Sequence, residues 1–258
     1  MLKRAKGIVL RSTVFGEADL IVTYLTPEYG LLKAFAKSPR KVKSRFGSSL
    51  EPLTYARISF LGKEESTLPR LTQSDIIRPF HALREDFRTF LSLSELLELN
   101  LSFLAERDPH PDIFTLLLTT LSKFEVNGGS ALLYLYYKIK FLEMAGYSPK
   151  LDVCGACGKA LPQDDSPAAA RRYAFCLPHG AVVCPRCEGR QDNASLKLSG
   201  GALRFYRSLL QWNSGVVDRI NAPESLLSEV GGVIDSHIRY ALGPSRVSSR
   251  KYLDGIPS

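Results

Sequence analysis

The strongest constraint on the fold of this chain is a pair of Cys-x-x-Cys turns with 26 residues between them. Each turn lets two thiolates reach one ion from the same backbone knuckle, and two knuckles complete a closed tetrahedral site with four sulfur ligands. Such a site has no open coordination position for water, so its metal stabilises a fold and does not catalyse. The spacing predicts one structural Zn²⁺ with the ligands Cys154, Cys157, Cys184 and Cys187.

Other uses of these cysteines are disfavoured. A redox-active dithiol of the thioredoxin type needs a βαβ setting, which the surrounding sequence does not predict, and a reducing cytosol opposes structural disulfides. Cys176 and His179 are alternative metal ligands, but neither belongs to a Cys-x-x-Cys turn. Both are therefore less favoured than the four paired cysteines.

The length and composition predict a folded chain of two or three small domains. It has 258 residues, of which 45% are hydrophobic and 23% charged, enough to bury a core. No apolar run approaches the roughly 18 residues that a membrane span requires. The N-terminal residues 1–11 carry charge and only a short apolar run, unlike a signal peptide. We therefore expect a soluble cytoplasmic protein without a membrane partner.

The first third of the chain has the pattern of β-structure. Short runs rich in Val, Ile, Leu, Thr and aromatic residues alternate with turn signals such as Gly16–Ala18 and Pro27–Gly30. Five strands at this spacing suit a small barrel. The expected strands are residues 7–15, 19–26, 31–37, 50–61 and 67–77.

After Pro79 the apolar residues recur at helical spacing. A Pro-containing break follows residue 107, and glycines end two of the later helical segments. The expected helices are residues 80–105, 112–126, 130–145, 199–212 and 223–242. We therefore expect an α+β multidomain chain with a β-barrel domain at 1–79, a helical domain at 80–150 and 196–258, and a zinc-binding insert at 151–195.

The positive charge is concentrated in the first third of the chain. Residues 1–80 hold 14 Lys and Arg and 7 Asp and Glu, a balance of +7 against a net charge of +8 for the whole chain. A basic domain of this kind suits a polyanion such as nucleic acid, although a basic surface also serves solubility alone. Segment 33–45 contains no acidic residue, and Phe35 within it and Phe46 directly after it are possible stacking faces. The predicted DNA-binding residues are Lys33, Lys37, Arg40, Lys41, Lys43 and Arg45, with Arg11 and Arg57 extending the surface.

Sequence motifs of common enzymes are absent. The chain has no P-loop, no Gly-x-Gly-x-x-Gly, no His-Glu-x-x-His and no Gly-x-Ser-x-Gly. Its carboxylates form no pattern that identifies a two-metal nuclease. The residues therefore predict a binding protein without catalytic residues or a small-molecule substrate.

A series of short motifs along the whole chain resembles the bacterial recombination mediator family RecO. No single motif is specific to the family, but the order and spacing of the motifs over the full length make the match specific. They are residues 7–11, 16–19, 26–30, 36–45, 50–53, 71–75 and 144–149, the paired Cys-x-x-Cys turns, and residues 248–253. One departure is visible: the family's basic loop usually reads Ala-Lys-Gly-Ala/Val-Arg, whereas Ser38 and Pro39 stand at its third and fourth positions here.

The resemblance implies a fold and a function. It implies an N-terminal OB-fold barrel, followed by a helical domain that carries a zinc-binding insert. It also implies a non-enzymatic DNA repair and recombination protein that binds single- and double-stranded DNA and anneals complementary strands. The implied partners are RecR, the C-terminal tail of single-stranded DNA-binding protein and, indirectly, the recombinase RecA. The alternatives are a protein-interaction scaffold of a repair complex, with little DNA activity of its own, and a zinc-dependent nuclease.

Overall fold

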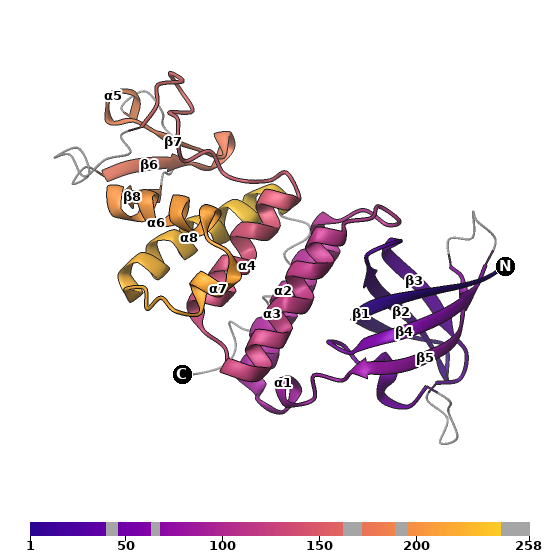
Figure 1. Ribbon diagram of the computed structural model, residues 1–258. Coiled ribbons are helices and arrows are strands. Elements are labelled where there is room, and N and C mark those ends of the chain that lie inside the picture. The colour runs from indigo at the N-terminus through magenta and orange to yellow at the C-terminus, as the bar shows by residue number, and fades with distance from the viewer. Residues whose placement is uncertain (40–45, 63–67, 162–171, 189–195, 244–258) are drawn as a thin grey trace. The chain divides into compact units, whose positions relative to one another are not determined.

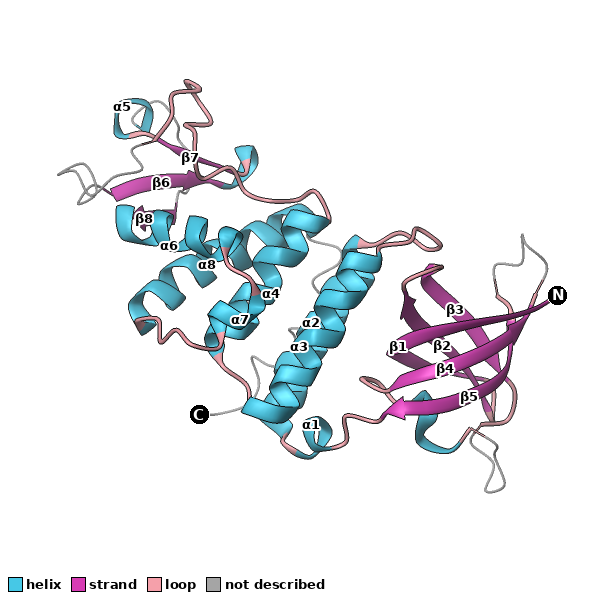
Figure 2. Cartoon of the chain, viewed as in Figure 1, coloured by secondary structure: helices cyan, strands magenta, loops and turns pink. Residues whose placement is uncertain are grey.

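The chain folds as two compact units, residues 1–130 and 131–258 (Figure 1). The computed structural model describes residues 1–39, 46–62, 68–161, 172–188 and 196–243. Among the described residues, helices predominate over strands in the second unit, and in the first unit helices follow a barrel of strands (Figure 2). None of the helices within these described ranges is long and apolar enough to cross a membrane. The domain bounds expected from the sequence stay a prediction.

The first unit begins with a closed five-stranded barrel, which confirms the predicted fold of this segment. The strands run in the order β1-β2-β3-β5-β4, and every neighbouring pair is antiparallel except β3 and β5. The N-terminal half of β1 pairs with β4 and its C-terminal half with β2, so one long strand belongs to both sides. A register shift between Val9 and Arg11 marks the point where β1 changes sides, as a bulge does in small barrels. The strands are β1 (Leu2–Phe15), β2 (Asp19–Thr26), β3 (Gly30–Ala36), β4 (Tyr55–Leu61) and β5 (Arg70–Arg78).

Apolar residues at alternating strand positions fill the interior of the barrel. Val9, Val22, Tyr24 and Ile58 are fully buried there. Phe46 belongs to the same core and is only 3% exposed, so the prediction that it offers a stacking face to nucleic acid is wrong. The chain folds back at the short 3₁₀ turn η1 (Gly47–Leu50), and an apolar ring at that position gains more from burial than from exposure.

Two expected elements are interrupted. The strand expected from residue 50 begins only at Tyr55, because η1 precedes it and Leu53 takes a left-handed backbone conformation with φ 72°. The single helix expected at residues 80–105 is divided at Asp86, whose side chain accepts a hydrogen bond from the Thr89 N–H at 2.9 Å. An aspartate that caps a helix N-terminus takes an extended backbone and so starts a new helix. The helices of this unit are α1 (Ala82–Glu85), α2 (Phe87–Phe103) and α3 (Pro111–Asn127).

The second unit combines helices with a small sheet of order β7-β6-β8. Lys138 of α4 and Asp235 of α8 form an ion pair of 2.7 Å, and the Lys138 side chain is only 9% exposed. The helices at the expected positions are α4 (Ala131–Met144), α6 (Gly200–Gln211) and α8 (Glu224–Leu242), with the short α7 (Ser214–Val217) between the last two. The sheet, which the sequence did not predict, consists of β6 (Arg172–Cys176), β7 (Ala181–Val183) and β8 (Leu196–Ser199); the 3₁₀ turn η3 (Leu177–His179) and α5 (Pro185–Glu188) complete this part.

Candidate metal centre and nucleic-acid interface

The first cysteine turn is held by backbone hydrogen bonds to its neighbours. The Gly158 N–H donates to the Cys154 carbonyl at 2.8 Å, and Gly158 has the positive φ of 70° that favours glycine. The Gly155 N–H donates to the Val182 carbonyl of β7 at 2.8 Å. A Cβ at Gly155 would lie 2.7 Å from that of Ala181, so the close approach of the turn to β7 requires glycine. The two glycines therefore fix the orientation of the first pair of thiols.

The second cysteine turn repeats this hydrogen-bond pattern. Cys184 directly precedes the four-residue helix α5, and the N–H groups of Cys187 and Glu188 in that helix donate to the Cys184 carbonyl at 2.9 Å and 3.1 Å. The Cys184 N–H in turn donates to the sulfur of Cys154 at 3.3 Å. This bond joins the two turns, so each presents its thiols toward the other.

The four paired cysteines come together as a group that could hold a metal ion. Their sulfur atoms all lie within 4.8 Å of one another, and the Cys157 and Cys184 sulfurs are 3.9 Å apart. Zinc–sulfur bonds of about 2.3 Å put the sulfurs of a tetrahedral site about 3.8 Å apart. The donor set therefore fits a four-thiolate zinc site. Among the residues that the structure describes, Cys176 and His179 lie outside this group, and Cys176 is buried in β6.

The thiols of the group differ in their readiness to ionise. Burial raises the pKa of Cys154, but backbone N–H groups of Cys184 and of its own turn donate to its sulfur and outweigh burial, so the pKa falls from about 9 to about 6. Hydrogen bonding with the thiols of Cys184 and Cys157 raises the pKa of Cys187 to about 12. A divalent cation among the sulfurs favours the thiolate form of all four, because metal binding and loss of the protons are coupled.

Two of the predicted DNA-binding cations are already in ion pairs. Arg11 pairs with Glu98 of α2, and Lys33 pairs with Glu106, which follows that helix. Lys37 and Arg57 are exposed and form no ion pair within the described ranges. The remaining predicted residues lie outside the described ones: Arg40, Lys41, Lys43 and Arg45.

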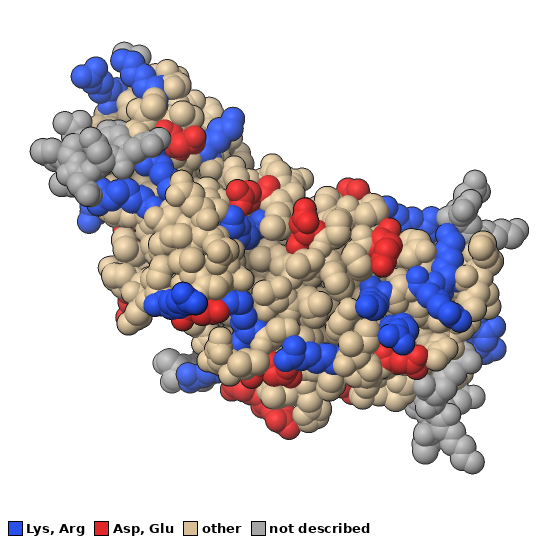
Figure 3. Space-filling view, viewed as in Figure 1, with Lys and Arg blue, Asp and Glu red and all other residues tan. Residues whose placement is uncertain are grey.

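A further cluster of cations occupies the outer face of β1 and β4. Lys6 lies directly opposite Arg57 in the antiparallel pair of β1 and β4, and Arg4 lies two residues before Lys6 on the same face. All three are exposed, and like charges directly opposite each other destabilise a sheet. On the neighbouring strand β5, Asp75 lies opposite Arg57. Asp75 accepts a hydrogen bond from Gln73 and forms no ion pair with Arg57. Lys and Arg side chains gather on the visible face of the barrel (Figure 3).

Lys6 was not among the residues predicted to bind DNA. The signal that could have found it is the alternation of β1, because Arg4 and Lys6 are two residues apart and so point to one side of a strand. That Arg57 lies opposite Lys6 depends on the register in which β4 pairs with β1. The cluster is therefore visible only when both strands are placed.

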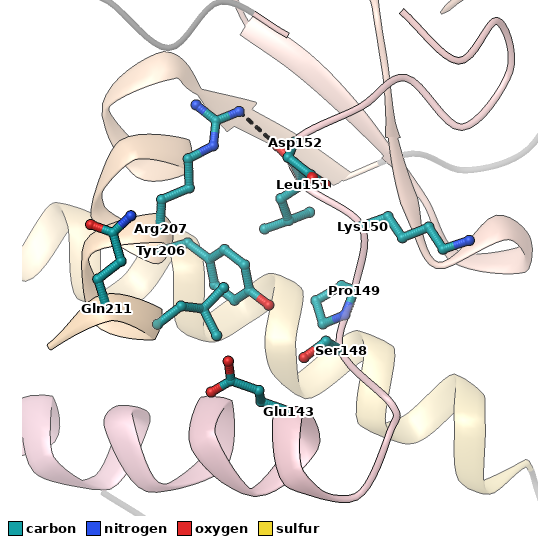
Figure 4. A pocket seen from close by; sticks show the side chains of 10 residues that line it. Glu143, Ser148, Pro149, Lys150, Leu151, Asp152, Tyr206, Arg207 and Gln211 are labelled. Carbon is teal, nitrogen blue, oxygen red and sulfur yellow. Dashed lines mark hydrogen bonds between the residues drawn. The ribbon is translucent and has the colours of Figure 1, made fainter. Parts of the chain in front are cut away.

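A pocket of about 520 Å³ lies in the second unit, between α6 and the segment that follows α4 (Figure 4). Leu151 and Leu210 provide apolar lining, and Arg207 donates a hydrogen bond to the Leu151 carbonyl at 3.1 Å. Glu143 and Asp152 also line it, so its two carboxylates balance its two cations. Burial raises the pKa of Tyr206, whose hydroxyl points toward Ser148 and Glu143 in Figure 4. The pocket therefore has no net charge that would favour an anionic ligand.

Comparisons with known proteins give one consistent result. The family model described as Recombination protein O N terminal matches residues 1–80, and the model Recombination protein O C terminal matches residues 84–251. The DNA repair protein RecO of Thermodesulfovibrio yellowstonii is 38% identical over 242 residues, which is 92% of each chain. The DNA repair protein RecO of Dehalococcoides mccartyi is 32% identical over 93% of this chain and 90% of the relative. That of Symbiobacterium thermophilum is 30% identical over all of this chain and 98% of the relative.

Proposed function

Because the chain belongs to the RecO family of DNA repair and recombination proteins, we propose that it binds single- and double-stranded DNA and anneals complementary strands. The observation that carries this proposal is the cation cluster of Arg4, Lys6 and Arg57 on the outside of the barrel. Within the described residues these opposed cations have no ion-pair partner, which costs the free protein stability, and a phosphate backbone relieves that cost. The face therefore suits a polyanion.

The proposed mechanism of annealing is electrostatic. Two DNA strands repel each other through their phosphates, and cations that neutralise phosphates on both strands lower this repulsion. We expect Lys37 and Arg57 to contact phosphates more strongly than Arg11 and Lys33, because Glu98 and Glu106 already neutralise the latter two. The sequence places Arg40, Lys41, Lys43 and Arg45 directly after Lys37, and we propose that they belong to the same surface.

We propose that the metal is a single structural Zn²⁺ held by Cys154, Cys157, Cys184 and Cys187. The ion would cross-link the two cysteine turns and so hold the segment before β6 against the end of β7. With four thiolate ligands it would have no free position for a reacting water, which supports a role without catalysis.

The proposed partners follow from the family. We propose that RecR and the C-terminal tail of single-stranded DNA-binding protein bind this chain, and that the assembly helps to load RecA onto DNA that single-stranded DNA-binding protein covers. This role places the protein in the cytoplasm, at the nucleoid. The alternative is a scaffold of a repair complex with little DNA activity of its own.

The test is the annealing rate of complementary oligonucleotides with the wild type and with Lys6→Gln/Arg57→Gln. We expect the variant to anneal at least about tenfold more slowly, because it neutralises fewer phosphates. Its affinity for single strands should also depend less steeply on salt, by roughly 0.7 in the logarithmic slope for each phosphate that is no longer neutralised. The control is Arg219→Gln/Arg239→Gln, which removes the same charge from exposed positions of the second unit.

Each outcome of this test decides something. A slower rate in the first variant and an unchanged rate in the control supports the barrel face as the DNA surface. Equal rates in both variants and the wild type would contradict that assignment. A wild type that neither binds nor anneals DNA would contradict the proposed activity and favour the scaffold.

A further inference from the structure

The outer face of β1, β2 and β3 ends in a pair of phenylalanine rings. Phe15 is the last residue of β1, and Phe35 lies on β3 opposite Ile21 of the intervening strand. Their ring centroids are 5.9 Å apart with an interplanar angle of 88°, an edge-to-face contact. Phe15 is 52% exposed, so a large part of its ring meets solvent. An exposed aromatic pair on a sheet face is a surface on which a planar ligand can stack.

The two ends of this face differ in whether their cations are in ion pairs. At one end Arg11 and Lys33 lie on either side of Thr23 and are neutralised by Glu98 and Glu106. At the other end, where Phe15 and Phe35 lie, the described cations carry no such acidic partners. Within the described residues, the cations of the aromatic end are therefore not held in ion pairs, unlike Arg11 and Lys33.

Two cations flank the aromatic pair. Arg70 of β5 lies beside Phe35 in the parallel pairing of β3 and β5, and Lys37 follows Phe35 by two residues. Both are exposed, and neither is in an ion pair within the part of the chain that the structure describes. The nearby carboxylate of Asp19 accepts a hydrogen bond from the Ser38 N–H at 2.6 Å, which fixes its position and leaves its negative charge in place. Glu17, in the turn between β1 and β2, is the other acidic residue at this end.

We propose that Phe15 and Phe35 form a stacking platform for unpaired bases of single-stranded DNA, with phosphates held by Lys37 and Arg70. This inference rests on the proposed DNA binding and adds a base-dependent component to it. A base offers a planar face for an aromatic ring only where it is unpaired and unstacked, whereas a duplex presents its phosphates to a protein surface. The platform therefore favours single strands, while the cation cluster of Arg4, Lys6 and Arg57 serves either form of DNA.

The first experiment compares affinities for three probes of equal length: oligothymidylate, an abasic oligonucleotide and a duplex. For Phe15→Ala we expect a loss of at least about fivefold in affinity for oligothymidylate. We expect little change for the abasic strand or the duplex, and an unchanged salt slope because every cation that meets a phosphate is kept. The control is Phe87→Ala, which removes a phenylalanine that is 61% exposed at the start of α2. Phe15→Tyr keeps the ring and should retain most of the affinity.

The second measurement places a fluorophore on the platform. The chain has one tryptophan, Trp212, so Phe15→Trp in a Trp212→Phe background carries a single indole at the end of β1. Stacking of a base on this indole should quench its fluorescence. We expect quenching with oligothymidylate and none with the abasic strand, which has the same charge.

These results separate the platform from the proposed function. A wild type that binds DNA, with a Phe15→Ala variant that keeps its full preference for oligothymidylate over the abasic strand, would overturn the platform alone. Equal quenching by both probes would also overturn it, because the indole would then report charge and not bases. Failure of the wild type to bind any of the three probes would overturn the proposed DNA binding itself.

Discussion

The barrel and the cysteine-bearing part of the second unit are both small β-structures, but they are held together differently. The barrel encloses a core of side chains such as Val22, Tyr24 and Ile58, and each of its five strands has a neighbour on both sides. The sheet of β6, β7 and β8 has strands of only three to five residues, and the four clustered thiols lie in turns outside it. Residues 155–160 of the first cysteine turn are all exposed and bury little apolar surface, so we expect the turns to need a cross-link, whereas the barrel does not.

The largest expected effect follows from removing the metal ligands. For Cys154→Ser/Cys184→Ser we expect loss of the bound zinc and of amide protection in β6 and β7, while the barrel amides stay protected. Structural zinc contributes on the order of 10 kcal/mol to small zinc-binding domains. Metal analysis and hydrogen exchange on the purified chain measure both effects.

The control for this comparison is Cys176→Ala, which removes a thiol that is outside the cluster. It should keep one zinc per chain. A double variant that retains its zinc, or a wild type without metal after preparation in the absence of chelators, would contradict the zinc site. Loss of barrel protection together with β6 and β7 would contradict the difference between the two regions.

An intermediate effect is expected from a cavity in the barrel core. Ile58 is fully buried in β4, so Ile58→Ala should lower the free energy of unfolding by about 2–4 kcal/mol in denaturant titrations. The zinc content should not change, since the second unit supplies all four ligands. Ile76→Ala, at a position of β5 that is 43% exposed, is the matched control, with an expected change within about 0.5 kcal/mol. A barrel variant that loses zinc would show that the two regions depend on each other.

The smallest effect concerns strain at one residue of the barrel unit. Ser38 has φ 54°, in the left-handed region that favours glycine, so Ser38→Gly should raise the free energy of unfolding by up to about 1 kcal/mol. The hydrogen bond from its N–H to Asp19 does not involve the side chain and is kept. The same change at Ser94 in the middle of α2 should instead destabilise by about 1 kcal/mol. Destabilisation by both variants would show that Ser38 is not strained.

The positions that sequence reasoning predicted well are those governed by local patterns. Helices α3, α4 and α8 begin and end close to their expected bounds, because apolar periodicity and the Pro and Gly signals at their ends act over a few residues. The position of Phe46 was misjudged for the opposite reason. Its neighbours in sequence are basic and polar, yet its ring enters the barrel core formed by distant strands. Local composition cannot show which side of a turn faces such a core.

The sequence alone predicted the barrel, the helices and the group of four cysteines, because strand alternation, helical periodicity and the Cys-x-x-Cys spacing are all properties of short segments. Only the tertiary structure showed that Glu98 and Glu106 neutralise Arg11 and Lys33, that Lys6 opposes Arg57, and that Phe15 meets Phe35. Each of these pairs joins residues far apart in the chain. Their positions depend on strand register and on the packing of α2 against the barrel, and neither can be predicted from a single segment of the sequence.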